Sequence, residues 1–361
     1  MGGCDEYQDS RSNRKYFSIN DALPNEWRTS GVIRKCGWAM IAVVIPCYKV
    51  STHICDLIRK IGSGVDVIFV VDDDCPEKSG LLVENAHIDP RVRVIYHKTN
   101  QGVGGAVLTG YRAAVEANAD VIVKIDGDGQ MDPALIPAFI APVLRGEADY
   151  TKGNRFFEIE TVRKMPIVRL MGNAGLSFLT KLSSGYWNLF DPTNGYTAIS
   201  AKVAERLPVN KISRRYFFES DMLFRLNTMR AVVMDIPMFA DYGNEQSNLK
   251  VSRELPRFLL GNLRNLVKRI AYNYFLRNFN YATLELIFGL AFLGFGIAFG
   301  GISWAEQLHQ GTLASAGTVM LAALPVIMGL QLILGFVNYD MASVPSSPLQ
   351  NRLHSDARKL K

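Results

Sequence analysis

Cysteine and histidine are scarce in this sequence, and neither forms a recognisable site. The five cysteines among 361 residues include no Cys-x-x-Cys pair and no metal-binding spacing: Cys4, Cys36, Cys47, Cys55 and Cys75. An odd number of scattered cysteines argues against a disulfide framework or a zinc site and is typical of a reducing cytosol. The five histidines are equally scattered, which argues against a catalytic centre built on imidazole.

The N-terminal region lacks the apolar core of a signal peptide. It begins Met-Gly, but position six is Glu6 rather than Ser or Thr, which argues against N-myristoylation. We therefore expect residues 1–36 to be a polar lead-in to the first domain.

Basic residues are unevenly distributed. The formal net charge of +6 could indicate a nucleic-acid ligand, but the basic residues gather in "RELPRFLLGNLRNLVKRIAYNYFLRNF", residues 253–279, directly before an apolar region. Apolar and basic residues mixed at near-helical spacing favour helices that lie on anionic lipid headgroups, the alternative being a solvated helix face. We expect a membrane partner and no nucleic acid, with amphipathic juxtamembrane helices over residues 251–281.

Two long apolar runs follow, at residues 284–304 and 313–337. Each has the roughly 20 residues needed to cross about 30 Å of hydrocarbon, although a buried soluble hairpin is an alternative. The connection "AEQLHQGT" has no Lys or Arg, whereas basic residues precede the first run and follow the second. The positive-inside rule therefore predicts a transmembrane hairpin over residues 282–340, a cytoplasmic tail over residues 341–361, and both termini in the cytoplasm.

Residues 37–250 alternate between strand-like and helix-like patterns. Apolar runs at 40–45, 65–74, 91–97 and 120–125 read as strands, and helical spacing separates them at 51–61 and 104–117. Such alternation predicts an α/β domain with a mostly parallel sheet and helices on both faces. Ligands of such sheets bind at the carboxyl ends of the strands, where this sequence places several aspartates.

Two nucleotide-binding motifs are excluded by spacing. The glycine-rich "GVGGAVLTG" precedes a helix, but Gly-x-Gly-x-x-Gly from Gly102 would need glycine where Val107 stands. A phosphate-binding P-loop fails for want of Gly-Lys-Ser/Thr. These glycines then indicate a tight turn and close helix packing, or a different kind of ligand loop.

The segment "DGDGQ" ends the fourth predicted strand and places Asp126, Asp128 and Gln130 at alternate positions. An Asp-Gly turn is one interpretation, whereas a calcium loop fails because its sixth position is Met131 instead of glycine. Three oxygen donors beside a second acidic strand end favour a Mg²⁺ or Mn²⁺ ion that holds a diphosphate.

Several motifs together resemble the family-2 inverting glycosyltransferases with a GT-A fold: "VVIPCYKV", "VVDDDCPEKSG", "NQGVGGAVLTGYRAA", "DGDGQ", "GNRF", "DPTNGYTAIS", "FFESDML" and "ADYGNEQSNLK". Within that family, the chain looks most like the polyprenyl-phosphate glycosyltransferases, a branch that includes dolichol-phosphate mannose synthase. The resemblance spans about residues 40 to 340, including the two C-terminal transmembrane helices.

The resemblance implies transfer of a hexose from a nucleotide sugar, first of all UDP-glucose, to a polyprenyl phosphate lipid. It places the protein in the bacterial inner membrane with its catalytic domain (residues 37–250) on the cytoplasmic side, and we expect a homo-oligomer. Rival interpretations are a processive polysaccharide synthase and a membrane scaffold that binds nucleotide sugars without turnover. The synthase motif Gln-x-x-Arg-Trp does not occur in this sequence.

The resemblance also implies roles for individual residues. For the nucleotide sugar these are Pro46, Tyr48, Asp72 and Asp73, with Asp126 and Asp128 acting through the metal that they and Gln130 hold. Residues matched to the acceptor phosphate are Arg155, Arg169 and Asn173. Acids matched to the reaction centre are Asp191, Glu219 and Asp221.

Departures from the family pattern leave the base and the sugar open. Lys49-Val50 replaces Asn-Glu after the first strand, Asp74-Cys75 replaces Gly-Ser, and Val103 stands where relatives carry a Lys. Glu219 and Asp221 would share a face on a strand but not on a helix. The segment "YGNEQSNLK" is either a loop that closes over the donor or a polar linker.

Overall fold

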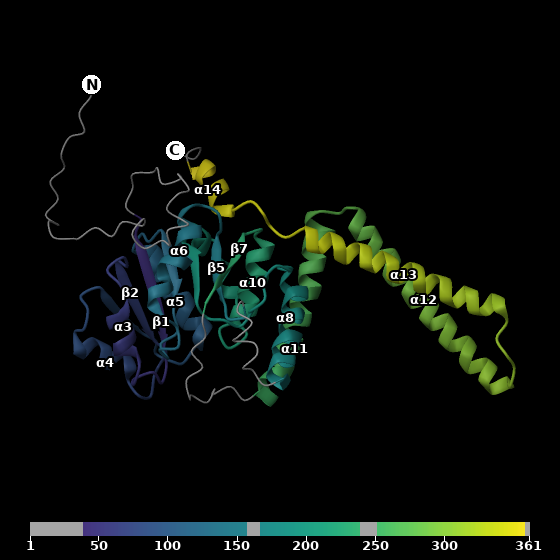
Figure 1. Cartoon of the computed structure of the whole chain (residues 1–361), viewed down its shortest axis with the longest axis horizontal. Helices are drawn as coiled ribbons and strands as arrows, with labels where there is room; N and C mark the ends of the chain where they lie inside the picture. The colour runs from purple at the N-terminus through teal and green to yellow at the C-terminus, as the bar shows by residue number, and fades with distance from the viewer. Residues whose placement is uncertain (1–38, 157–166, 239–250, 358–361) are drawn as a thin grey trace, which may run out of the picture.

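The computed structural model describes residues 39–156, 167–238 and 251–357, which form an α/β domain followed by a long helical hairpin (Figure 1). The predicted lead-in over residues 1–36 and the "YGNEQSNLK" segment lie outside the described residues.

A seven-stranded sheet forms the centre of the α/β domain, in the order β3-β2-β1-β4-β6-β5-β7. Only β6 runs antiparallel to its neighbours β4 and β5, so the predicted mostly parallel sheet is confirmed. The strands are β1 (Ile41–Cys47), β2 (Val67–Asp72), β3 (Val92–Tyr96), β4 (Val121–Lys124), β5 (Tyr150–Asn154), β6 (Thr197–Ser200) and β7 (Val233–Pro237).

Helices cover both faces of the sheet, as predicted. They are α3 (Ile54–Lys60), α4 (Ser79–Ala86), α5 (Val103–Glu116), α6 (Ile136–Leu144), α8 (Ile167–Ser184), α9 (Ala201–Glu205) and α10 (Phe218–Thr228), with short turns η1 (Pro133–Leu135) and η2 (Val209–Lys211).

Alternate residues of each strand enter two separate apolar cores because successive side chains point to opposite faces. In β1, Ala42 and Val44 pack with α5, α9 and α10, whereas Val43 and Ile45 pack with α3 and α6. The central strands are therefore apolar throughout, as expected of a sheet buried on both faces.

The glycine-rich turn brings α5 close to the sheet. Gly102 precedes α5 with φ of +86°, a conformation that favours glycine. A Cβ at Gly110 would overlap the side chain of Val44 on β1, so this position requires a hydrogen atom alone. These two positions confirm the turn and the close packing that the sequence indicated.

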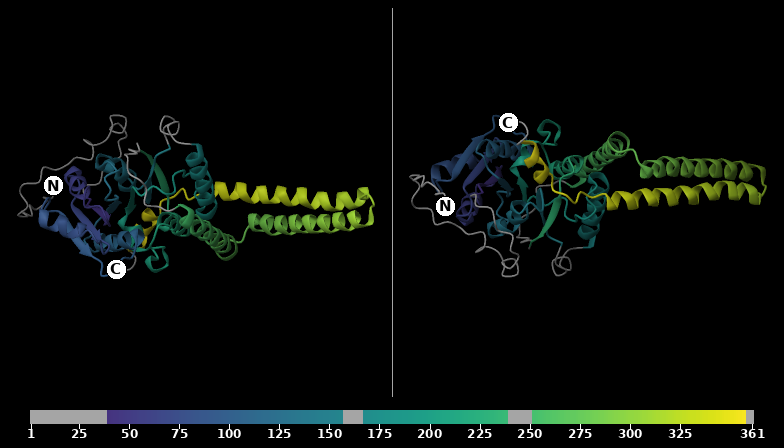
Figure 2. Two further views of the ribbon diagram at one scale, coloured as in Figure 1. Left: turned by 90° about the horizontal axis from the view of Figure 1, so that it is seen from below. Right: turned by 90° about the horizontal axis from the view of Figure 1, so that it is seen from above.

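Beyond the domain, α11 (Val251–Ile270) and the π-helix η3 (Ala271–Arg277) lead into two long helices, α12 (Tyr281–Gln310) and α13 (Ala316–Ala342). Both are long and apolar enough to cross a membrane. They run side by side away from the α/β domain (Figure 2). Gly296 and Gly329 let the helices approach closely, since a Cβ at either glycine would meet backbone atoms of the other helix.

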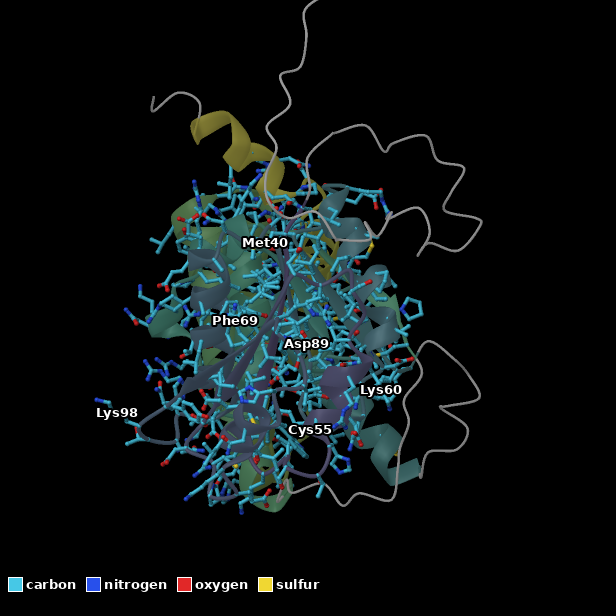
Figure 3. All side chains as sticks on the ribbon, turned by 90° about the vertical axis from the view of Figure 1, so that its left-hand side faces the viewer. Met40, Cys55, Lys60, Phe69, Asp89 and Lys98 are labelled. Carbon is cyan, nitrogen blue, oxygen red and sulfur yellow. The ribbon has the colours of Figure 1, made fainter. Side chains whose placement is uncertain are left out.

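The chain then returns to the α/β domain as α14 (Leu349–Ala357). Asp149, immediately before β5, accepts hydrogen bonds from the backbone N–H groups of Leu349 and Gln350 at 2.7 Å each. Figure 3 shows α14 near Met40, which precedes β1, and Lys98, which follows β3, at the other end of the domain. The tail helix thus contacts the edge opposite the carboxyl ends of the parallel strands.

Candidate functional site

Most candidate residues follow the carboxyl ends of parallel strands, so the fold gathers them along one edge of the sheet. Tyr48 follows β1, Asp72 ends β2, Asp126 follows β4 and Arg155 follows β5. Pro46 is buried within β1, whereas Tyr48 is 45% exposed at this edge. The site therefore lies where open α/β sheets bind ligands.

A buried lysine connects two of the candidate acids. Lys124, the last residue of β4, is 1% exposed, and its Nζ lies 2.8 Å from Asp126 Oδ1 and 3.3 Å from Glu219 Oε1. Burial alone would lower the pKa of Lys124, but these carboxylates raise that pKa above its ordinary value. Lys124 is therefore a permanent cation that links the end of β4 to the first turn of α10.

The backbone at Gly195 packs directly against Asp126 and Lys124. A Cβ at Gly195 would overlap Asp126 Oδ2 and lie 2.5 Å from Lys124 Nζ. The glycine in "DPTNGY" is therefore required by the close approach of the chain to the Asp126–Lys124 pair.

The "DGDGQ" turn presents oxygen donors at the end of β4. Asp126 and Asp128 are both partly exposed, and Asp128 Oδ1 accepts a hydrogen bond from Gln130 N at 3.0 Å. Within the described residues, no group of three or more His, Cys, Asp or Glu side chains is arranged to hold a metal ion. Two carboxylates and an amide are hard oxygen donors, so the residues present fit a divalent cation that takes its other ligands from substrate and water.

The carboxylates of Asp72 and Asp73 are buried and bonded to backbone N–H groups. The backbone N–H groups of Cys75 and Gly80 donate to the Asp72 carboxylate at 2.8 and 2.7 Å. The backbone N–H groups of Gln101 and Gly102 donate to the Asp73 carboxylate at 2.8 and 2.7 Å. The two acids thus shape the turns after β2 and β3. Direct contact of either carboxylate with a nucleotide stays a prediction.

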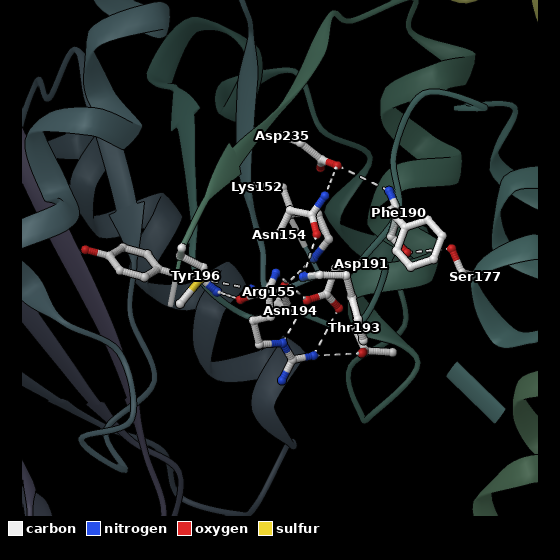
Figure 4. A network of polar contacts seen from close by, with 12 residues as sticks. Lys152, Asn154, Arg155, Ser177, Phe190, Asp191, Thr193, Asn194, Tyr196 and Asp235 are labelled. Atoms are coloured by element: carbon white, nitrogen blue, oxygen red, sulfur yellow. Dashed lines mark hydrogen bonds and ion pairs between the residues drawn. The ribbon is translucent and has the colours of Figure 1, made fainter. Parts of the chain in front are cut away.

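Arg155 and Asp191, for which the family resemblance implies separate roles, form an ion pair (Figure 4). Arg155 Nε donates to Asp191 Oδ2 at 2.7 Å and Nη2 donates to Oδ1 at 3.0 Å. Burial alone would raise the pKa of Asp191, but hydrogen bonds and charge from Arg155 hold it below the ordinary value. Asp191 is consequently ionised at neutral pH.

The other two candidates for the acceptor phosphate, Arg169 and Asn173, are positions of α8. Their side chains lie outside the described residues. Their proposed contacts therefore stay a prediction.

Glu219 and Asp221 are on a helix, α10, so the alternative that placed them on one strand face is wrong. Glu219 pairs with Lys124. Asp221 is 5% exposed and accepts hydrogen bonds from Ser213 N at 2.8 Å and from Asn265 Nδ2 on α11 at 3.0 Å. The helix thus directs one acid to the β4 end and the other to the juxtamembrane helix.

Sequence reasoning missed a polar row across the sheet. Lys124, Thr197, Lys152 and Asp235 are successive register partners on β4, β6, β5 and β7, so their side chains share one face. Lys152 is also 1% exposed. The available signal was a lysine inside each of the buried strands "VIVK" and "YTKGN".

The sequence model that describes glycosyl transferase family 2 matches residues 42–207. Undecaprenyl-phosphate mannosyltransferase of Micrococcus luteus is 31% identical over 173 residues, which cover 47% of this chain and 70% of that protein. The chain belongs to glycosyl transferase family 2. The matched region of this glycosyltransferase contains Asp126, Asp128, Arg155 and Asp191.

Two further comparisons extend this result. UDP-N-acetylglucosamine--dolichyl-phosphate N-acetylglucosaminyltransferase of Methanococcus voltae is 28% identical over 217 residues, covering 56% of this glycosyltransferase and 86% of that protein. Among solved structures, mannosyl-3-phosphoglycerate synthase from Rubrobacter xylanophilus superimposes with a TM-score of 0.50 at 16% identity, covering 67% of this chain and 77% of that one. The second match supports the GT-A fold.

Proposed function

We propose that this family 2 glycosyltransferase is a membrane enzyme that transfers a hexose, with inversion, from a nucleotide sugar to polyprenyl phosphate. The similar proteins from Micrococcus luteus and Methanococcus voltae, named for undecaprenyl and dolichyl phosphate acceptors, support this acceptor class. One arrangement carries the proposal: the acids after β4 and the Arg155–Asp191 pair after β5 share a sheet edge in a chain that continues into an apolar hairpin. UDP-glucose is our first candidate donor.

The amphipathic helix α11 supports a lipid acceptor on the cytoplasmic leaflet. Leu259, Leu260 and Leu263 on α11 are each about half exposed or more, at 49%, 70% and 55%, close in sequence to Arg264 and Lys268. An apolar helix face bordered by basic residues is typical of helices at an anionic membrane surface. We infer that α11 lies on the cytoplasmic leaflet and brings the site to the headgroup of the acceptor.

Helix α8, which carries two candidates for binding the acceptor phosphate, is hydrogen-bonded directly to α11. Ser183 Oγ on α8 donates to Asn262 Oδ1 at 2.5 Å, and Arg269 donates to Leu182 O at 2.7 Å. If α11 lies on the membrane surface, its bonds to α8 would hold α8, and with it Arg169 and Asn173, near the lipid phosphate. Arg155 would bind the same phosphate, with its fork oriented by Asp191.

Asp126 and Asp128, with Gln130, would hold Mg²⁺ or Mn²⁺, which when bound would stabilise the negative charge of the departing nucleoside diphosphate. Lys124 would hold Asp126 Oδ1 in place through their ion pair. Because Glu219 pairs with Lys124 whereas Asp221 is bonded to α11, we assign the role of the α10 acids in the reaction centre to Glu219.

A strong general base is unnecessary in this scheme. A phosphate monoester has a second pKa near 6, so the attacking oxygen is already largely anionic at neutral pH. Asp191 is ionised but bound to Arg155, so we infer that it orients the guanidinium rather than removing a proton. Alignment of the phosphate against the donor would supply most of the rate.

The function is tested with detergent-purified full-length protein, undecaprenyl phosphate, Mg²⁺ or Mn²⁺, and a panel of nucleotide sugars. We expect one donor to give a lipid carrying a single hexose, identified by mass, with inverted anomeric configuration. A water-soluble polymer would indicate a polysaccharide synthase instead, and donor binding without any product would indicate a scaffold.

Asp128→Ala should lower the initial rate of product formation at least about 100-fold, because loss of a charged metal ligand removes stabilisation of the leaving group. The measurement is the initial rate at saturating donor and acceptor. Asp56→Ala is the control, since it removes a 71% exposed carboxylate from α3. Full activity in Asp128→Ala would rule out the metal role.

A further inference from the structure

Lys152 of β5 is a buried cation that the reaction scheme above does not use. It is 1% exposed, and its Nζ donates a hydrogen bond to the backbone oxygen of Asn194. Its register partners are Thr197 on β6 and Asp235 on β7. A fully buried lysine is costly unless nearby groups stabilise its charge, so its neighbours indicate its role.

The neighbours belong to the loop that carries Asp191. Three side chains at the end of β5 and directly after it anchor this loop (Figure 4). Lys152 donates a hydrogen bond to Asn194 O, and Arg155 binds Asp191. Asn154 Nδ2 donates at 3.0 Å to Asp235 Oδ2. The same Asp235 oxygen accepts a hydrogen bond from Phe190 N at 3.2 Å. The position of Asp191, and through it the fork of Arg155, therefore depends on the end of β5.

Charge gives Lys152 a second function beyond anchoring the loop. Asp191 is 1% exposed, and both Arg155 and Lys152 lower its pKa. A guanidinium bonded to a single carboxylate is neutralised by it and attracts another anion weakly. Lys152 is an additional cation beside the loop. The negative charge of Asp191 is therefore shared between Lys152 and Arg155 and does not fully neutralise Arg155.

We propose that Lys152 is a positioning residue for the acceptor phosphate: its ammonium fixes the Asn194 loop and shares the charge of Asp191, which leaves Arg155 able to bind a lipid phosphate. This inference rests on the proposed function, because it concerns the acceptor half of that reaction.

Four charged groups surround Lys152: Asp191 on the loop, Glu219 on α10, Asp235 on β7 and Lys124 on β4. Burial is the main cause that lowers the pKa of Lys152 to about 8, against the three carboxylates, which raise it. Lys152 is thus mostly charged at pH 7 and loses its proton above about pH 8. The KM of the wild-type protein for the acceptor should therefore rise above pH 8.

The experiment uses full-length protein and the donor that gives product in the panel assay. Lys152→Met removes the charge and the hydrogen bond, whereas Lys152→Gln keeps a donor for Asn194 O without the charge. We expect both variants to raise the KM for undecaprenyl phosphate at least tenfold, to leave the donor dissociation constant within twofold, and to lose the rise above pH 8. Lys60→Met, at the exposed end of α3, is the control and should match the wild type.

Thermal unfolding establishes that each variant is folded, and the test relies on Lys152→Gln alone if Lys152→Met is not folded. An unchanged acceptor KM in folded Lys152→Gln, or an equal loss of donor affinity, would overturn the role of Lys152. Absence of lipid product from the wild-type protein would instead overturn the proposed function, before any variant is compared.

Discussion

Buried lysines lie against the candidate acids of this site. Lys124 contacts Asp126 and Glu219, and Lys152 lies close to Asp191. A carboxylate taken out of water without a partner would become protonated and lose its affinity for cations. Each buried lysine therefore provides a positive charge beside an acid that the proposed reaction requires.

Gly195→Ala tests how tightly the first of these clusters is packed. The new Cβ would overlap Asp126 Oδ2 and crowd Lys124 Nζ, so the carboxylate must move from its present position. We expect Mn²⁺ affinity, measured by electron paramagnetic resonance, to fall at least tenfold and the transfer rate to fall with it.

Gly62→Ala is the matched control, since a Cβ at Gly62 meets nothing within 4 Å. It should bind Mn²⁺ like the wild type. Wild-type metal affinity in Gly195→Ala would mean that Asp126 is not a ligand, or that the turn relaxes freely around the methyl group.

At the scale of elements, Asp340 near the end of α13 joins the hairpin to the α/β domain. Its carboxylate is 4% exposed and accepts hydrogen bonds from Arg269 on α11 at 2.5 and 2.9 Å, from Tyr274 on η3 at 2.6 Å and from Trp187 after α8 at 2.8 Å. One side chain thus connects α13 to the contiguous α11 and η3 and to the segment after α8, which lies 153 residues away from Asp340. Such a buried network fixes geometry, because any other arrangement leaves a charge unpaired.

Asp340→Leu should destabilise the protein by about 3 to 5 kcal/mol, because Arg269, 2% exposed, would be left buried without its partner. Thermal unfolding of the detergent-purified protein measures the change. The double variant Arg269→Met/Asp340→Leu should recover most of the loss, since it removes both charges. Equal melting temperatures for the single and double variants would contradict the pairing.

The helical hairpin is connected to the α/β domain at both of its ends. The chain enters it through α11 and η3, and leaves it to dock α14 against the opposite edge of the sheet (Figure 1). Asp149, fully buried, accepts from Leu349 N, Gln350 N and Val232 N. The tail therefore limits how far the domain can rotate against the two long apolar helices.

A chain that ends at Ser347 should melt at a lower temperature than the full chain. Loss of α14 leaves Asp149 with one of these three donors, and a buried acceptor without partners costs about 1 to 3 kcal/mol. The control is a chain that ends at Ala357, which keeps α14 and should melt like the full chain. An unchanged melting temperature after removal of α14 would show that its contacts contribute little.

Elements with a local signal could be predicted from the amino-acid pattern alone. Strand runs such as Ile41–Cys47 are apolar throughout because both faces are buried, and the long helices α12 and α13 follow from apolar runs that only a membrane or a deep core would accept. The position of "DGDGQ" after β4 was likewise readable, because a strand end is marked by the change from apolar to acidic residues.

Which side chains meet could not be predicted from the amino-acid pattern and follows from the fold. Arg155 binds Asp191, which is 36 positions away in the sequence. Lys124 contacts Glu219 across 95 positions, and Arg269 binds Asp340 across 71. Strand order and register bring such residues together, and neither is encoded in a local pattern. Burial then gives each pair its strength, because charges removed from water must find a partner within the fold.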